Sequence, residues 1–146
     1  PRLNAWSYWL YLVAGLTMLA GFLLPGGAAS AGWTAYPPLA TLATAGQTAW
    51  LLGMFVLIVS SLLGAINMIV TIIQLRAPGL TLMRLPFFVW SQLVTAFLLL
   101  LAFPPLQAAA VLQLMDRVAR TSFFLPTGLV VSGQALDVSG GGSPIL

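Results

Sequence analysis

The chain has 146 residues, of which 60% are hydrophobic and only 5% are charged, and its mean hydropathy is +1.05. Soluble domains carry about 25% charged residues, so this composition excludes a soluble globular protein. The net charge of +3 arises from five Arg and two Asp spread thinly along the chain, which does not suit nucleic-acid binding, and the absence of Cys excludes disulfides and thiolate metal sites.

Three long apolar blocks follow one another along the chain, and each is long enough for a membrane-spanning helix, which needs about 20 apolar residues. The blocks predict spans at about 4–24, 49–75 and 86–115, followed by a tail at 116–146. Pro104-Pro105 lies inside the third block and is expected to kink that helix or to end its first part. The expected fold is all-α: a transmembrane helix-bundle fragment with three spans, part of a single membrane domain over 1–146.

The arginines indicate an orientation, because cytoplasmic loops carry an excess of positive charge. Three crossings place Arg2, Arg76 and Arg84 on one side of the membrane and Arg117 and Arg120 on the other. This bias of three against two predicts that the N-terminus lies inside, and that the loop after the first span and the tail lie outside.

The second block carries polar residues at helical spacing. Steps of four and three residues put one set on a single helix face, flanked by Ser61: Ser60, Gly64, Asn67, Thr71 and Gln74. An unpaired amide costs several kcal/mol in hydrocarbon, so this face is expected to contact protein or water. The pattern alone favours helix packing, with Asn67 bonding across an interface. The alternative is a water-filled route for protons or a polar substrate.

The first block repeats this pattern near its expected inner end. Asn4, Ser7 and Tyr11 are separated by three and four residues and share a helix face. Two spans with polar faces would together line a hydrated path.

Several motifs resemble subunit I of the haem-copper terminal oxidases, the cytochrome c oxidase family. These are PRLNAWSYWL, GWTAYPPL, SSLLGAINMIVTII, LPFFVWSQLVTAFLLLL, and TSFF with GGGSPIL. Their order and spacing match along nearly the whole chain, and they resemble the third, fourth and fifth of the family's twelve core helices. The resemblance implies an internal fragment of the catalytic subunit of a proton-pumping respiratory oxidase, which reduces O2 to water with electrons from cytochrome c.

The resemblance also implies cofactors and partners. Haem and copper belong to the full-length enzyme, and their ligands lie on other helices, so this fragment is expected to hold no metal ligand and no catalytic residue, and to be inactive alone. The expected partners are the lipid bilayer, the remainder of subunit I, other oxidase subunits, and cytochrome c or a quinol as electron donor, with no nucleic acid. We expect the protein to be integral to a bacterial plasma membrane.

Site residues follow from the resemblance position by position. Residues matching the polar lining of the family's proton channel are Asn4, Ser7, Ser60, Ser61 and Asn67. Trp33 matches a tryptophan near a propionate of the high-spin haem, and Tyr36 lies in the same outer loop. An interfacial aromatic anchor is an equally good interpretation of Tyr36.

Two departures from the family pattern stand out. Phe55 to Ile58 occupies the place where many members have a His-Leu-Ala-Gly step, and Leu125 to Ser139 is an insertion in the outer tail. A quinol oxidase of the same family is the alternative function. A non-catalytic membrane helix bundle or a transporter is the alternative from another class.

Overall fold

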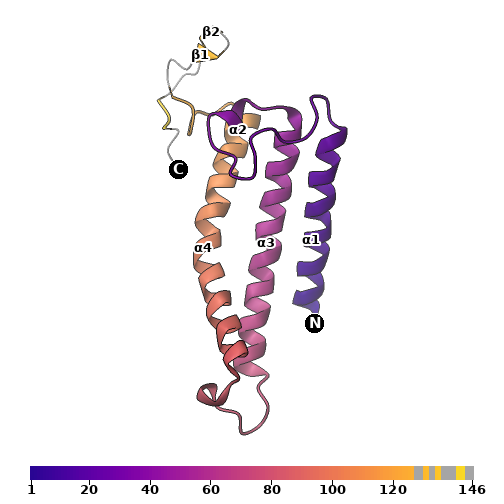
Figure 1. Ribbon diagram of the computed structural model, residues 1–146, viewed down its shortest axis with the longest axis vertical. Coiled ribbons are helices and arrows are strands. Elements are labelled where there is room, and N and C mark those ends of the chain that lie inside the picture. The colour runs from indigo at the N-terminus through magenta and orange to yellow at the C-terminus, as the bar shows by residue number, and fades with distance from the viewer. Residues whose placement is uncertain (127–129, 132–133, 136–140, 144–146) are drawn as a thin grey trace.

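Three long helices run side by side in the computed structural model, which describes all residues except 127–129, 132–133, 136–140 and 144–146 (Figure 1). They are α1 (Arg2–Ala20, continued by the 3-10 helix η1, Gly21–Leu23), α3 (Ala45–Gln74) and α4 (Phe87–Val118). Helix α3 lies in the middle and packs against both α1 and α4. All three are long and apolar enough to cross a membrane, so the prediction of a helical fold with three membrane-length helices is confirmed.

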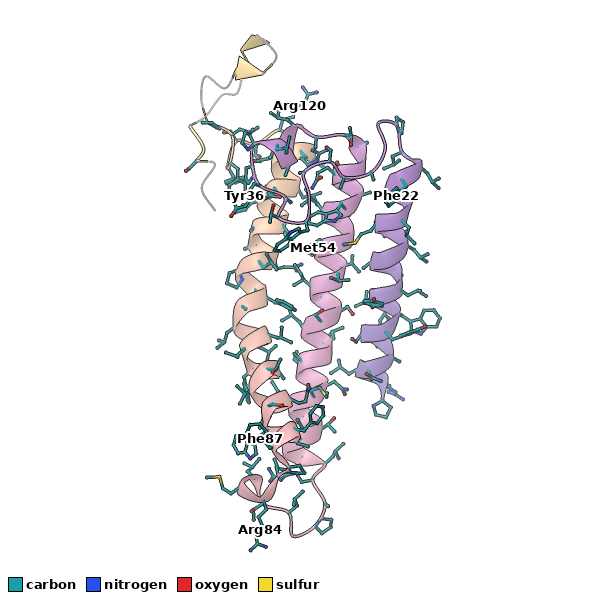
Figure 2. All side chains as sticks on the ribbon, viewed as in Figure 1. Phe22, Tyr36, Met54, Arg84, Phe87 and Arg120 are labelled. Carbon is teal, nitrogen blue, oxygen red and sulfur yellow. The ribbon has the colours of Figure 1, made fainter. Side chains whose placement is uncertain are left out.

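Two loops join these helices at opposite ends. The loop from α1 to α3 carries the one-turn helix α2 (Leu39–Leu42), and the loop from α3 to α4 carries the 3-10 helix η2 (Leu82–Arg84). Tyr36 and Arg84 lie near opposite ends of the helices (Figure 2). The 30 residues of α3 correspond to about 45 Å at 1.5 Å per residue, so the two loops are separated by a full span. Which end faces the inside stays a prediction.

The helix bounds differ from the expected ones at two places. Helix α3 begins at Ala45 rather than near residue 49, and α4 continues to Val118. Pro104 and Pro105 lie inside α4 without ending it, so of the two outcomes expected for these prolines, an end to the helix is wrong. Spanning helices tolerate such prolines because neighbouring groups and local adjustments satisfy the freed carbonyls.

The tail adds a short hairpin to the helical fold. Strand β1 (Val130–Val131) pairs antiparallel with β2 (Gln134–Ala135), beyond the end of α4. The predicted insertion Leu125 to Ser139 includes this hairpin but falls largely outside the described residues.

Small residues let α1 approach α3 closely, as is usual between membrane helices. A Cβ on Gly53 would lie 2.5 Å from Met18 Cγ and 3.0 Å from the Ala14 carbonyl oxygen. A Cβ on Gly46 would collide with the Gly27 carbonyl oxygen in the loop above. The approach at Gly53 therefore brings α1 against α3, and the approach at Gly46 holds the loop against the start of α3.

Candidate functional site: a polar groove and a clamped loop

Ser7 and Ser60, two residues predicted from the sequence, meet across the α1–α3 interface. The Ser7 hydroxyl donates to the Ser60 carbonyl oxygen at 2.9 Å, and the Ser60 hydroxyl donates to the Ser7 carbonyl oxygen at 2.6 Å. Ser60 is buried, with 4% of its surface exposed. The two hydroxyls therefore tie the helices together reciprocally, as the packing interpretation of the polar face expects.

Replacing Ser60 with Ala removes one of these two bonds and leaves the Ser7 carbonyl without its partner. We expect a loss of about 1 kcal/mol of stability, the usual net worth of a hydrogen bond. Thermal unfolding of Ser60→Ala and Ser7→Ala in detergent checks this, and the two losses should be roughly additive because each hydroxyl donates to the other residue's backbone carbonyl. Ser91→Ala is a matched control, since the exposed Ser91 hydroxyl donates only within its own helix, to Phe88. A Ser60→Ala protein as stable as Ser91→Ala would contradict the prediction.

The remaining predicted channel residues line an open pocket of about 330 Å³, here called the polar groove. The groove crosses a face of α3 between α1 and α4. Its lining residues are Asn4 of α1, Ser61, Gly64, Ala65, Asn67 and Met68 of α3, and Gln92, Thr95, Ala96 and Leu99 of α4. The structure thus brings Asn4, Ser61 and Asn67 together from two helices that are far apart in the sequence.

The amides of the groove have few protein partners. Within the described part of the chain, the side chains of Asn4, Asn67 and Gln92 make no hydrogen bond, whereas the Thr95 hydroxyl donates to the Ser91 carbonyl oxygen at 2.8 Å. Asn67 and Gln92 are half-buried and Asn4 is exposed. An amide offers two donors and one acceptor, and leaving it unpaired in apolar surroundings costs free energy. The groove therefore favours water or another polar group as its occupant.

The predicted single polar face divides in two in the structure. Ser60 turns toward α1, while Ser61, Gly64 and Asn67 open into the groove. Further along, the Thr71 hydroxyl donates to the Asn67 carbonyl oxygen at 2.7 Å, and Gln74 is exposed at the end of α3.

Sequence analysis missed the contribution of α4 to this groove. Gln92 and Thr95 are three residues apart in a mostly apolar span, which is the same spacing signal that identified Asn4 and Ser7. That signal was present in the stretch WSQLVTAF but rests on two residues alone.

At the opposite end, Arg117 of α4 holds both α2 and the loop that follows it. Its Nε donates to the Thr48 hydroxyl at 2.9 Å, and its two terminal nitrogens donate to four backbone carbonyls at 2.6–3.1 Å. Those carbonyls belong to Ala40, Thr41, Ala43 and Thr44. All five N–H donors of the guanidinium are therefore engaged.

The neighbouring Asp116 organises the start of the tail. Its carboxylate accepts hydrogen bonds from the Thr121 hydroxyl at 2.6 Å and from the backbone N–H groups of Phe123 and Phe124 at 2.9 and 2.8 Å. Asp116 is buried, with 5% of its surface exposed. Consecutive residues of α4 thus fix the loop on one side and the tail on the other.

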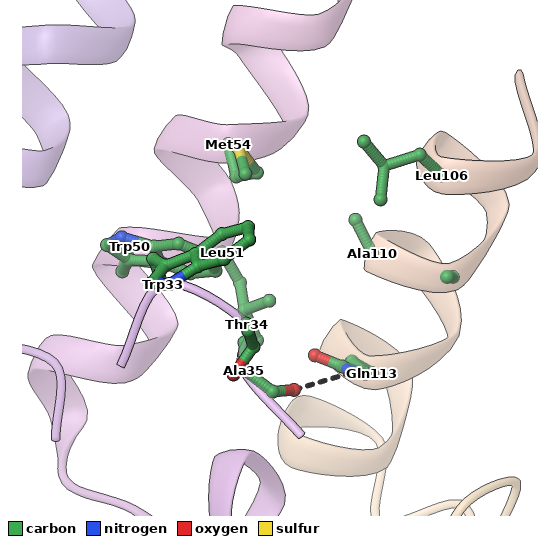
Figure 3. A pocket seen from close by; sticks show the side chains of 10 residues that line it. Trp33, Thr34, Ala35, Trp50, Leu51, Met54, Leu106, Ala110 and Gln113 are labelled. Atoms are coloured by element: carbon green, nitrogen blue, oxygen red, sulfur yellow. Dashed lines mark hydrogen bonds between the residues drawn. The ribbon is translucent and has the colours of Figure 1, made fainter. Parts of the chain in front are cut away.

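Trp33 lines a small pocket of about 80 Å³ between the loop that precedes α3 and the helices α3 and α4 (Figure 3), and Tyr36 lies outside this lining, next to Ala35 in the chain. Trp33, Trp50, Met54, Leu106 and Gln113 are among its lining residues, and the Gln113 amide donates to the Ala35 carbonyl oxygen at 3.0 Å. Trp33 is 84% exposed and Tyr36 is 62% exposed. Neither side chain donates or accepts a hydrogen bond within the described residues, so both can contact a further group at this end.

Comparison of the sequence with known proteins identifies the family of the chain. The family model described as cytochrome c and quinol oxidase polypeptide I matches residues 1–139, which include all three spans, the groove and the Arg117 contacts. The chain belongs to this oxidase subunit I family.

Individual relatives within the oxidase subunit I family agree. The chain is 52% identical over 120 residues to the probable cytochrome c oxidase subunit 1-beta of Nocardia farcinica, a match that covers 80% of this chain and 20% of the relative. It is 46% identical over 152 aligned positions to the alternative cytochrome c oxidase subunit 1 of Bradyrhizobium diazoefficiens, covering 100% of this chain and 25% of the relative.

A third relative is named after the haem-copper oxidases. The haem-copper oxidase subunit I+III of Aeropyrum pernix is 49% identical over 132 residues, covering 88% of this chain and 16% of the relative. The chain therefore spans a quarter or less of the oxidase subunits with which it was matched. The haem-copper oxidase family implies haem and copper in a complete enzyme.

Proposed function

We propose that this chain is an internal part of the catalytic subunit of a proton-pumping terminal oxidase that reduces O2 to water with electrons from cytochrome c. Membership of the family and the names of the relatives support the oxidase class. The observation that carries the specific role is the polar groove, because free amides from separate helices converge in a segment whose surroundings are apolar.

The amides and hydroxyls of the groove suit proton conduction through water. Asn4, Ser61 and Asn67 would bind a chain of ordered waters, along which protons move by exchange of hydrogen bonds. Neutral groups hold water without holding a proton, which a carboxylate in the same place would do. Ser7 and Ser60 would keep the α1 and α3 walls of this path at a fixed separation, since their hydroxyls bind across the interface.

Haem and copper would supply the electron transfer and O2 chemistry of the complete enzyme. The chain contains no His and no Cys, so its donor set does not fit a haem iron or a copper ion, and we assign no metal ligand to it. At the outer end, Trp33 would donate its indole N–H to a haem propionate, with Tyr36 in the same loop. The chain alone would be inactive and would act together with the remainder of subunit I and other oxidase subunits in the bilayer.

The proposed function also includes an orientation of the chain in the membrane and an electron donor. The arginine distribution supports an orientation with the N-terminus and the groove end of α1 inside, in which protons would enter from the inside of a bacterial plasma membrane. The family description covers both cytochrome c and quinol oxidases, and a quinol oxidase is the second candidate.

Purification of the full-length oxidase that contains this chain tests the proposal. We expect haem absorbance in reduced-minus-oxidised spectra, and O2 consumption sustained by reduced cytochrome c. Consumption sustained only by a quinol would replace cytochrome c with the second candidate. A pure, folded protein with no haem absorbance would instead indicate a transporter or a structural helix bundle.

A further inference from the structure

Helix α4 contributes a polar wall to the groove, and Gln92 is its principal polar group. Helices α1 and α4 lie on either side of α3 (Figure 1), so Asn4 and Gln92 approach the groove from opposite flanks. Of the two polar α4 residues that line it, Thr95 bonds to its own helix through Ser91. Gln92 is half-buried and makes no hydrogen bond with the described residues.

The groove has the size and chemistry to hold water beside Gln92. One water needs about 10–15 Å³ of accessible space and two to four polar partners, and the groove offers about 330 Å³. Asn67 of α3 and Asn4 of α1 line the same space with free amides. Ala96 and Leu99 add apolar surface to the α4 wall, so loss of the Gln92 amide would leave, among the α4 lining residues, only the Thr95 hydroxyl oxygen to bind water, and its hydrogen is already donated to Ser91.

We propose that Gln92 is a positioning residue for proton uptake, which holds water against the amides of Asn4 and Asn67. This inference rests on the proposed function and extends the proton path to a third helix. It gives Gln92 no direct contact with substrate or cofactor. Its action is to keep the water chain continuous along the α4 side.

The test compares variants of the full-length oxidase in vesicles. Gln92→Leu removes the amide at similar volume, Gln92→Asn keeps an amide on a shorter stem, and Ser91→Ala changes the adjacent exposed residue. The measurement is the rate of proton uptake from the inside during a single turnover, followed with a pH-indicator dye. Haem spectra confirm that each variant is folded.

We expect uptake to slow about fivefold in Gln92→Leu, which is the change in water occupancy expected from losing one hydrogen bond. Gln92→Asn should restore uptake to within about twofold of the wild type, because it restores a water-binding amide. Ser91→Ala should leave it unchanged. A purely structural role for Gln92 would not produce this order, and wild-type uptake in Gln92→Leu would overturn the proposal.

A fourth variant covers the case in which Gln92→Leu does not fold. Gln92→Glu preserves the shape of the side chain and adds an ionisable group, so uptake should become slower as pH rises and the carboxyl loses its proton. Uptake that matches the wild type at every pH would overturn the proposal.

The outcome for Gln92 is separable from that of the proposed function. The variant Asn67→Asp places a carboxyl in the groove. If it lowers the number of protons released per electron while Gln92→Leu leaves proton uptake at the wild-type rate, only the role of Gln92 fails. If a pure, folded protein shows no haem absorbance, the proposed function itself fails.

Discussion

Replacing Arg117 with Met in the assembled oxidase is expected to cost roughly 3 kcal/mol or more of stability. The methionine keeps the apolar stem but removes five hydrogen bonds, four of them to backbone carbonyls. Carbonyls that lose a charged donor while remaining partly buried pay the cost of desolvation as well. The measurement is the thermal unfolding midpoint of the purified oxidase in detergent, followed by loss of monodisperse protein.

Two further variants give this prediction its controls. Arg120→Met removes the same charge three residues further along the chain. The Arg120 side chain is exposed and makes no hydrogen bond in the described part of the chain, so this variant should change the midpoint little. Arg117→Lys keeps the charge but has three donors in place of five, so its loss should be intermediate. Equal midpoints for Arg117→Met and Arg120→Met would contradict the prediction that the five Arg117 hydrogen bonds stabilise the protein.

The loop held by Arg117 is also the loop that precedes α3 and follows Trp33 and Tyr36 in the chain. Arg117 fixes α2 and the segment after it, and Gln113, one turn earlier on α4, fixes Ala35. This end of α4 therefore holds the loop that carries these two aromatic residues. In an oxidase, the expected consequence of Arg117→Met includes a disturbed environment at this end of the protein.

The spans could be predicted because the bilayer imposes their length and hydrophobicity. The start of α3 could not be predicted, because Gln47 and Thr48 are polar residues of a kind common in loops. Their side chains are hydrogen-bonded by groups that lie far away in the sequence. The Gln47 side-chain oxygen accepts a hydrogen bond from the Ala31 N–H at 3.4 Å, and the Thr48 hydroxyl accepts one from Arg117. Likewise, Pro104 and Pro105 suggested a possible break, but α4 continues through them.

The candidate site was only partly visible in the sequence. Helical spacing identified Ser60 and Asn67 as polar residues on one helix, but the 100° step between Ser60 and Ser61 lets neighbours serve different partners. The convergence of Arg117 on carbonyls more than 70 positions earlier has no local signal. The role of Gln92 could not be predicted from the sequence either, because the residues that line the groove with it belong to α1 and α3.

Replacing Asn67 with Asp in the full-length oxidase should uncouple pumping from O2 reduction. An aspartate introduces an ionisable group among amides that otherwise hold water without a proton. Such a group can bind a proton on the path and retain it. We expect proton release per electron to fall below about half of the wild-type value while O2 consumption stays within about twofold, since an ionised carboxylate perturbs transfer along the path more than chemistry at a distant centre.

The claim that the groove is a proton path is tested most directly by the number of protons released per electron in vesicles. Asn67→Asp is compared with Gln74→Glu, which makes the same amide-to-carboxyl change on the same helix at an exposed position outside the groove lining. Our account predicts a reduced ratio for Asn67→Asp and a wild-type ratio for Gln74→Glu, with O2 consumption recorded on the same vesicles. A wild-type ratio in Asn67→Asp would contradict the account and would leave Asn67 as a residue of helix packing.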